Sequence, residues 1–321
     1  MVIEWQHFSR PTVASFLVGI FVFPLFIRWQ ESWGVGQKIK KEGPNLHLHK
    51  ENTPTMGGVV IVAATFLGLL AGGYFDGRGR DIFIFSLFFF LLGFWDDFFK
   101  SFLKKPWGIK ARYKFFYQLL GGAGILLWGA RFFPHQVILP FSARVVELGP
   151  VAFFLYGLLV IVASANAFNI VDGLDGLAGG CGVLSFAFFT LLFLESGRPE
   201  FAGFSGAIIG ALLAFLWFNF WPARIFMGDS GSLPLGALMG VLSLVSGHSL
   251  FLIPAGIIFV IDTLSVVLQV ASFQLFRRRI FLMSPLHHHF ELRGMKESQI
   301  TIRFWIVQFL GVLCAFWGMG G

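Results

Sequence analysis

Charged residues are scarce in this chain, and no long polar stretch interrupts its hydrophobic runs. Asp, Glu, Lys and Arg make up 13% of the 321 residues, whereas hydrophobic residues make up 56%. The mean hydropathy is +0.76, and 43 of the residues are Phe. This composition excludes a large polar domain and is typical of a membrane protein. We expect one polytopic, all-α integral-membrane domain over residues 1–321.

Cysteine is almost absent as well. Cys181 and Cys314 lie far apart in apolar segments and form neither a CxxC pair nor a metal-binding spacing, so they give no sign of redox chemistry. The first ten residues lack the basic region and the cleavage site of a signal peptide, and we expect the first span to be retained. The net charge of +7 lies in short loops, which indicates membrane orientation and no nucleic-acid partner.

Ten apolar segments are long enough to cross a bilayer, at about 20 residues per crossing. They are residues 11–29, 56–75, 82–99, 114–133, 150–168, 177–195, 203–220, 232–247, 250–276 and 301–319. The segment 232–276 is too long for one crossing, and the turn Ser246–Ser249 divides it.

Basic residues are distributed unevenly over the loops. Eighteen of the 24 Lys and Arg residues follow odd-numbered spans, and six lie in the other loops. Cytoplasmic loops are rich in Lys and Arg, so the odd loops are predicted to be cytoplasmic and both termini periplasmic. The cytoplasmic face then holds five aspartates: Asp96, Asp97, Asp172, Asp175 and Asp229. Carboxylates at membrane depth are costly and usually functional, and a cluster of them requires a cation.

Two adjacent aspartates close the third predicted span. Asp96 and Lys100 could simply form an i,i+4 pair at a helix end. However, Asp96 and Asp97 point about 100° apart on a helix, so at least one faces the bundle. We therefore favour a functional pair.

The segment 166–180 interrupts apolar sequence without any basic residue. Asn166, Asn169, Asp172 and Asp175 recur at every third position, which predicts one slowly drifting helical face. Four glycines in the same segment permit a close approach of the backbone. The segment lacks the GK[ST] of a P-loop, and no strand precedes it as in a dinucleotide-binding turn.

A third polar segment follows the seventh span. Asp229 lies beside Gly228 and Gly231 and suits Mg²⁺, which takes one or two carboxylates together with substrate phosphates. Phe226 is placed to stack on a base. The alternative is a Pro/Gly turn in which Ser232 caps the next helix.

The last predicted cytoplasmic loop carries Pro285-Leu-His-His-His-Phe-Glu291. Three consecutive histidines cannot all face one metal from a helix, so we expect one or two of them to bind phosphate instead. Asp262 lies within the ninth span, as either a satisfied buried acid or a supporting residue of the site. Lys50 stands out among the basic residues before the glycine-rich start of the second span.

Taken together, these motifs resemble the phospho-N-acetylmuramoyl-pentapeptide transferase family. The matching motifs, in the family's order, are TPTMGG at Thr53–Gly58, DDxxK at Asp96–Lys100, NxxDGLDGL at Asn169–Leu177, FMGDxGS at Phe226–Ser232 and PLHHHFE at Pro285–Glu291. The resemblance implies a homodimer of ten-helix subunits in the bacterial plasma (inner) membrane. It also implies transfer of phospho-MurNAc-pentapeptide from UDP-MurNAc-pentapeptide to undecaprenyl phosphate, which gives UMP and lipid I for peptidoglycan biosynthesis.

The resemblance also implies roles for individual residues. Asp229 is the expected Mg²⁺ ligand, and the expected catalytic residues are Asp96, Asp97, Asp229, Lys100, His288 and His289. The expected substrate-binding residues are Lys50, Thr55, Asn169, Asp172, Gly173, Leu174, Asp175, Asn219, Phe226 and Gln269. Two positions depart from the family pattern: Asn52 stands where Gly is usual, and Lys40 where Arg is usual.

Two alternatives remain at this point. A related transferase for another sugar, such as UDP-GlcNAc, is disfavoured by the TPTMGG and HHHFE motifs. A proton-coupled transporter would place its acids within the spans, where only Asp262 lies. The sequence leaves open the dimer interface, the peptide stem, the division of roles between Asp96 and Asp97, and whether an aspartyl-phosphate forms.

Overall fold

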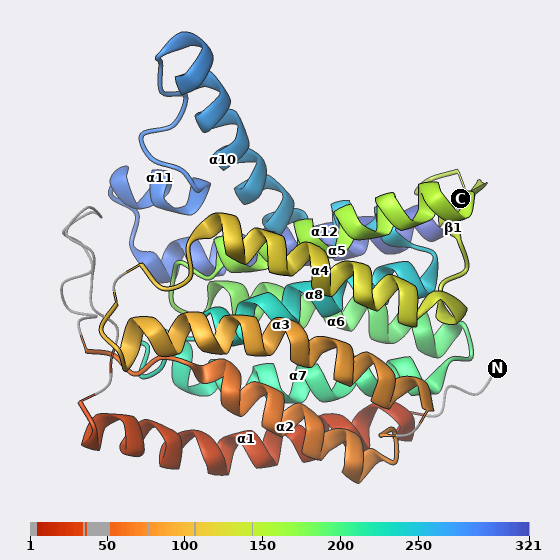
Figure 1. The fold of residues 1–321 in the computed structure, drawn as a ribbon, viewed down its shortest axis with the longest axis horizontal. Helices are drawn as coiled ribbons and strands as arrows, with labels where there is room; N and C mark the ends of the chain where they lie inside the picture. Colours follow the sequence, from red (N-terminus) through yellow and green to blue (C-terminus); the bar gives the residue numbers. More distant parts are fainter. Residues whose placement is uncertain are drawn as a thin grey trace.

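The computed structural model is a bundle of long helices that lie side by side (Figure 1). It describes residues 5–34, 36, 52–75, 77–105, 107–142 and 144–320. The long helices are α1 (Gln6–Ser32), α2 (Gly57–Gly72), α3 (Gly77–Ser101), α4 (Ala111–Trp128), α5 (Pro150–Val171), α6 (Leu177–Glu195), α7 (Pro199–Asn219), α8 (Asp229–Ser246), α10 (Ile257–Phe276) and α12 (Glu297–Met319). Shorter elements are η2 (Ala130–Phe132), η3 (Ser249–Phe251), α9 (Leu252–Ala255) and α11 (Leu286–Leu292).

The predicted class, an all-helical polytopic membrane protein, is confirmed. Within the described residues, eight helices are long and apolar enough to cross a membrane, and α2 is a shorter apolar helix. Each of the ten predicted segments overlaps a helix, including α4, whose first turn carries basic residues. The number of crossings and the orientation remain predictions. A small antiparallel hairpin of β1 (Gln136–Ile138) and β2 (Val145–Glu147) lies between α4 and α5, where no strand was predicted.

The predicted span 250–276 is wrong as a single helix. It is divided into η3, α9 and α10, and the break falls at Gly256. Pro254 lacks a backbone N–H and Gly256 has a low helix propensity, so the two together end α9. Beyond the break, α10 leaves the bundle and projects away from it (Figure 1). The segment 286–292, expected to be a loop, forms the short helix α11.

Helices α7 and α8 form the centre of the bundle. Almost all their residues are buried; α7 packs against α1 and α6, and α8 packs against α3 and α5. The C-terminal ends of α3, α5 and α7 and the N-terminal ends of α4, α6, α8 and α12 meet at one end of the molecule, on the left in Figure 1. The elements packed at this end are helices, so its loops are held on a rigid base.

Two glycines let neighbouring helices touch the start of α8. A Cβ on Gly58 of α2 would collide with the backbone of Ser230 and Gly231, and one on Gly93 of α3 would collide with the carbonyl oxygen of Asp229. Glycine has no Cβ, so the backbones of α2 and α3 reach van der Waals contact with α8. This contact fixes the depth of Asp229 relative to α3.

Candidate active site

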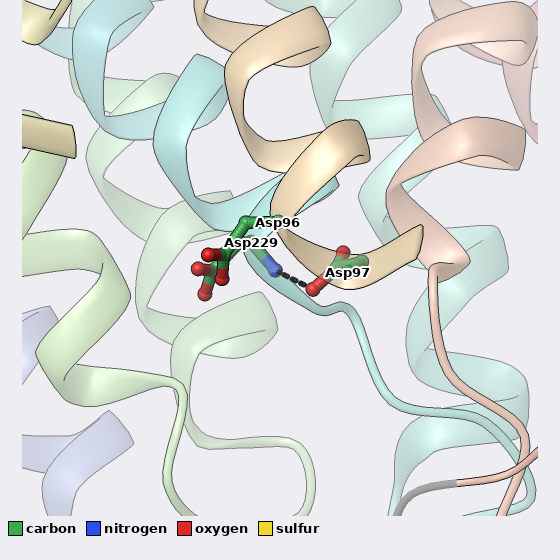
Figure 2. A group of neighbouring side chains, drawn as sticks. All are labelled: Asp96, Asp97 and Asp229. Atoms are coloured by element: carbon green, nitrogen blue, oxygen red, sulfur yellow. Dashed lines mark hydrogen bonds between the residues drawn. The ribbon is translucent and has the colours of Figure 1, made fainter. Parts of the chain in front are cut away.

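Three carboxylates gather at the end of the bundle where α3 and α8 meet. Asp96, Asp97 and Asp229 each offer one oxygen within 4.8 Å of the others, and all three are largely buried. The carboxylates of Asp96 and Asp229 point to the same place, whereas that of Asp97 points toward a backbone amide (Figure 2). The two adjacent aspartates therefore have different surroundings, as their separation of about 100° on a helix predicts.

Asp97 holds the start of α8. Its Oδ1 accepts a hydrogen bond from the amide of Asp229 at 3.0 Å, and its Oδ2 accepts one from the amide of Ser230 at 2.8 Å. The residue before α8 is Gly228, which has no side chain to cap the helix. Asp97 supplies the missing acceptor from a neighbouring helix, and its negative charge also suits the positive end of the helix dipole.

Two lysines neutralise the other two carboxylates. Lys100 forms an ion pair with Asp96 Oδ2 and lies 3.4 Å from Asp229 Oδ2. Lys114, at the start of α4, forms a close ion pair with Asp229 Oδ2 and lies 3.9 Å from Asp96 Oδ2. The site thus brings three carboxylates and two ammonium groups together. The ammonium groups offset the repulsion between the clustered carboxylates.

Asn169 joins the cluster from α5. Its Nδ2 donates to Asp229 Oδ1 at 2.7 Å and to Ser232 Oγ at 2.8 Å. Ser232 in turn donates to the carbonyl of Gly228 at 3.0 Å, within a helix that already begins at Asp229. The interpretation of Ser232 as the helix cap is therefore wrong, because Asp97 takes that role.

Asp172 and Asp175 lie in a turn between α5 and α6. The predicted helical face ends with Asn169, because α5 stops at Val171 and the glycine-rich sequence then turns. Burial raises the pKa of Asp172 well above its ordinary value, and the negative charges of Asp229 and Asp97 raise it further. Asp172 therefore keeps a proton more readily than an ordinary aspartate.

The second half of this turn is fixed from two sides. From α7, Asn219 Oδ1 accepts the amide of Gly176 at 2.9 Å. From α12, Glu297 Oε1 accepts a hydrogen bond from the amide of Asp175 at 2.7 Å. The hydroxyl of Thr301 donates to the backbone carbonyl of Asp175 at 3.0 Å. The Asp175 carboxylate accepts the amide of Ala223 at 2.9 Å. Asp175 and Asn219 therefore hold the turn 172–176 against the C-terminal end of α7 and the segment that follows it.

Phe226 and Thr55 lie on adjoining backbone segments. The amide of Phe226 donates to the carbonyl of Pro54 at 2.8 Å, and its carbonyl accepts the amide of Gly57 at 2.9 Å. Gln30 holds the backbone of Thr55 through two hydrogen bonds of 2.7 and 2.9 Å. Lys50, the remaining basic residue expected near this segment, lies outside the described residues.

The histidines lie on α11 and differ in their partners. His287 is fully buried and bonds to Asp262 of α10. His288 Nδ1 pairs with Glu291 at 2.6 Å, and His289 Nδ1 accepts the amide of Leu282 at 3.1 Å.

Two expected substrate-binding residues have structural contacts of their own. Gln269 bonds to the backbone of 280–281, so its amide stabilises the loop after α10. Leu174 is a buried residue of the turn that carries Asp172.

Lys114, Glu297 and Thr301 belong to this site but were not predicted from the sequence. Lys114 follows several other basic residues at the start of α4, where membrane orientation was a sufficient explanation. Glu297 and Thr301 lie one helical turn apart at the start of α12, on one helix face, and this spacing is the only signal they offered.

The donor set suits a hard divalent cation. Carboxylate oxygens are the ligands that Mg²⁺ and Ca²⁺ prefer, and the three in the cluster are close enough for one ion. Asp96 and Asp229 are the more available ligands, since their Oδ2 atoms pair with lysine ammonium groups, whereas both oxygens of Asp97 already accept backbone amides. A cation could therefore replace an ammonium group without breaking the helix cap.

Comparisons with known proteins cover nearly the whole chain. The model of "Glycosyl transferase family 4" matches residues 81–247, and that of "Phospho-N-acetylmuramoyl-pentapeptide-transferase signature 1" matches residues 50–62. Three similar proteins carry the name phospho-N-acetylmuramoyl-pentapeptide-transferase. That of Thermoanaerobacter sp. (strain X514) is 38% identical over 98% of this chain and 99% of its own. That of Caldanaerobacter subterraneus subsp. tengcongensis is 39% identical over 98% of this chain and 99% of its own. That of Latilactobacillus sakei subsp. sakei is 40% identical over 96% of this chain and 97% of its own.

Proposed function

The chain belongs to the phospho-N-acetylmuramoyl-pentapeptide transferases, and we propose that it transfers phospho-MurNAc-pentapeptide from its UDP carrier to undecaprenyl phosphate. The products are lipid I and UMP, and the reaction belongs to peptidoglycan biosynthesis. The observation that carries the proposal is the buried cluster of Asp96, Asp97 and Asp229 at the helix ends of a polytopic membrane protein. Phosphoryl transfer depends mainly on positioning and on charge neutralisation, and this cluster with its two lysines can provide both.

Mg²⁺ is the cofactor that we propose for the cluster, with Asp229 as its principal ligand. Asp96 lies close enough to share the ion. When bound, Mg²⁺ would neutralise charge on the diphosphate of the donor.

The donor nucleotide is proposed to bind along the turn 172–176 and the neighbouring loop of Phe226. Asn219 and Asp175 shape this region through backbone hydrogen bonds. The ring of Phe226 would stack on uracil, while its backbone stays hydrogen-bonded to the start of α2. Lys50, Thr55 and Gln269 would complete the donor site, and His288 and His289 would face its sugar and phosphates.

Transfer is proposed to occur in one displacement. An oxygen of undecaprenyl phosphate attacks the β-phosphorus, a new P–O bond forms, and the bond from this phosphorus to the bridging oxygen breaks with the electron pair leaving on UMP. The acceptor has a second pKa of about 6, so at pH 7 it is largely dianionic and needs no strong base. Lys100 would hold the acceptor phosphate.

The two adjacent aspartates then have separate tasks. Asp97 acts as a positioning residue, because its oxygens are committed to the amides of Asp229 and Ser230. Asp96 is the one that shares the centre of the cluster with Asp229 and the lysines, and it acts on the reacting groups through its charge.

The remaining features follow from the family and the charge distribution. We propose ten crossings of the bacterial cytoplasmic membrane, both termini outside, the active site on the cytoplasmic face, and a homodimer of single-domain subunits. The acceptor would reach the cluster laterally from the lipid, and the donor from the cytoplasm.

The test is Mg²⁺-dependent release of UMP by the purified, detergent-solubilised protein. UDP-MurNAc-pentapeptide and UDP-GlcNAc are supplied in turn with undecaprenyl phosphate. Release from the first donor, with loss on chelation of Mg²⁺, is the expected result. Release from UDP-GlcNAc alone would assign the chain to the other sugar. Absence of release from both donors, with pH-driven uptake in proteoliposomes, would favour the transporter.

A further inference from the structure

Asp262, on α10, is completely buried and holds the start of α11. Its Oδ2 accepts a hydrogen bond from His287 Nδ1 at 2.5 Å, and its Oδ1 accepts the backbone amide of His287 at 3.2 Å. The residue before α11, Pro285, offers no side-chain cap. One carboxylate from α10 therefore fixes both the backbone and the ring of His287.

The hydrogen bond to a carboxylate assigns the proton of the neutral ring to Nδ1. The other nitrogen, Nε2, is then an acceptor. Within the described part of the chain, Nε2 is buried without a hydrogen-bond partner. Buried nitrogens without a partner are uncommon, and each calls for an explanation from its surroundings.

His287 Nε2 faces the turn between α5 and α6. A Cβ on Gly173 would lie 2.5 Å from this nitrogen, so only a residue without a side chain fits opposite the ring. Gly173 is the neighbour of Asp172, in the first half of the turn. The second half is held by Asn219 and α12, as described above, so the ring of His287 borders the half that lies nearer the aspartate cluster.

We propose that Asp262 is a positioning residue for the donor site. It acts through His287, by fixing the ring and its tautomer so that the acceptor Nε2 faces the turn at Gly173. Asp262 itself touches neither substrate. The inference rests on the proposed function, in which this turn binds the donor nucleotide, and it assigns a purpose to a buried acid that the reaction itself does not use.

The variant Asp262→Asn keeps the side-chain volume at position 262. Its amide nitrogen can donate a hydrogen bond to His287 Nδ1, whereas the carboxylate of Asp262 accepts one from it. The ring is then expected to carry its proton on Nε2, which turns the acceptor at Gly173 into a donor. We expect the KM for UDP-MurNAc-pentapeptide to rise about tenfold, with the KM for undecaprenyl phosphate unchanged. The magnitude follows by analogy with metal-bound histidines, where loss of the hydrogen-bond partner that orients the ring costs about 10- to 100-fold. The matched control is Thr263→Val on the same helix, whose buried hydroxyl has no hydrogen-bond partner among the described residues.

A double-mutant cycle with His287→Asn tests whether Asp262 acts through the ring. Asn places an amide near the position of Nδ1 and removes Nε2. In the His287→Asn background, Asp262→Asn is expected to have no additional effect on the donor KM. Additive effects, equal increases in both KM values, or a donor KM within about twofold of wild type would each overturn the proposal.

The ¹⁵N spectrum of histidine-labelled wild-type protein provides a readout that needs no Asp262 variant. His287 is identified by the signals lost in His287→Asn, and it is expected to show a protonated Nδ1 and an unprotonated Nε2. The opposite tautomer would overturn the proposal even if Asp262→Asn fails to fold. Wild-type protein without UMP release would instead contradict the proposed function, so the two failures are distinguishable.

Discussion

Lys114 of α4 and Asp229 of α8 are direct partners in an ion pair between Nζ and Oδ2. The lysine side chain is only 17% exposed, and the same Nζ lies 3.9 Å from Asp96 Oδ2. Lys114 therefore lies close to both of the carboxylates that are not committed to backbone amides. It is the contact that ties α4 to the centre of the site.

We expect Lys114→Gln to lower kcat/KM about 100-fold. Removal of one preorganised charge-stabilising group from an active site typically lowers the rate about 100- to 1,000-fold, and 100-fold corresponds to about 2.7 kcal/mol of barrier. The measurement is UMP release at saturating Mg²⁺. Lys110→Gln is the matched control, because Lys110 is exposed in the same basic segment. Activity of Lys114→Gln within about threefold of wild type would show that the pair has no part in transfer.

The variant Asp229→Asn is expected to abolish transfer and to weaken Mg²⁺ binding, because it removes the charge that Lys114 and Lys100 now balance. Binding is measured by titration of Mn²⁺ as a paramagnetic substitute, independently of turnover. Asp81→Asn is the control: Asp81 is also a buried, ion-paired aspartate, but its partner is Arg131 in η2, at the other end of α4. An Asp229→Asn protein that retains activity within about tenfold, or about 1.4 kcal/mol of barrier, would contradict the assignment.

Hydropathy was sufficient to predict the helices, because crossing a bilayer requires long apolar segments and every backbone group in them must be paired. It could not predict the break at Gly256, since the apolar sequence continues through it. The spacing of Asn169, Asp172 and Asp175 predicted one helical face, but the local structure differs, because α5 ends at Val171 and a glycine-rich turn follows.

Contacts with the backbone were the least predictable part of the site. The partners of Asp97 are two amides of α8, and amides have no signature in a sequence. Lys114 could not be predicted for a different reason. Its pairing with Asp229 depends on how α4 packs against α3 and α5, and no local pattern records that.

The variant Phe226→Ala is expected to raise the KM for UDP-MurNAc-pentapeptide several-fold and to leave the KM for undecaprenyl phosphate unchanged. Stacking of a base on an aromatic ring contributes about 1–3 kcal/mol. The backbone hydrogen bonds of Phe226 to Pro54 and Gly57 do not depend on its side chain, so the loop should persist. Trp217→Ala is the control. Trp217 is also aromatic and lies near the C-terminal end of α7, but its side chain is 73% exposed. An equal change in both KM values would point to a folding defect rather than to stacking.

Stereochemistry tests the single displacement. With a donor that is chiral at the β-phosphorus, one displacement inverts the configuration, whereas an aspartyl-phosphate intermediate requires two displacements and retains it. We expect inversion, because both oxygens of Asp97 are held by amides and Asp96 is ion-paired with Lys100. Retention, observed by ³¹P NMR of isotopically labelled product, would rule out direct attack.

The contacts of Gly58 and Gly93 with α8 affect how tolerance to mutation should be interpreted in this protein. Neither glycine carries a functional group, yet any side chain at either position would collide with the backbone at 229–231. The collision would displace the carboxylate of Asp229, which this backbone supports. A scan of all substitutions would therefore score these two positions as severely as the aspartates themselves. Chemical rescue would separate the two kinds of position, because an added small acid can replace a missing carboxylate but cannot make room for a methyl group.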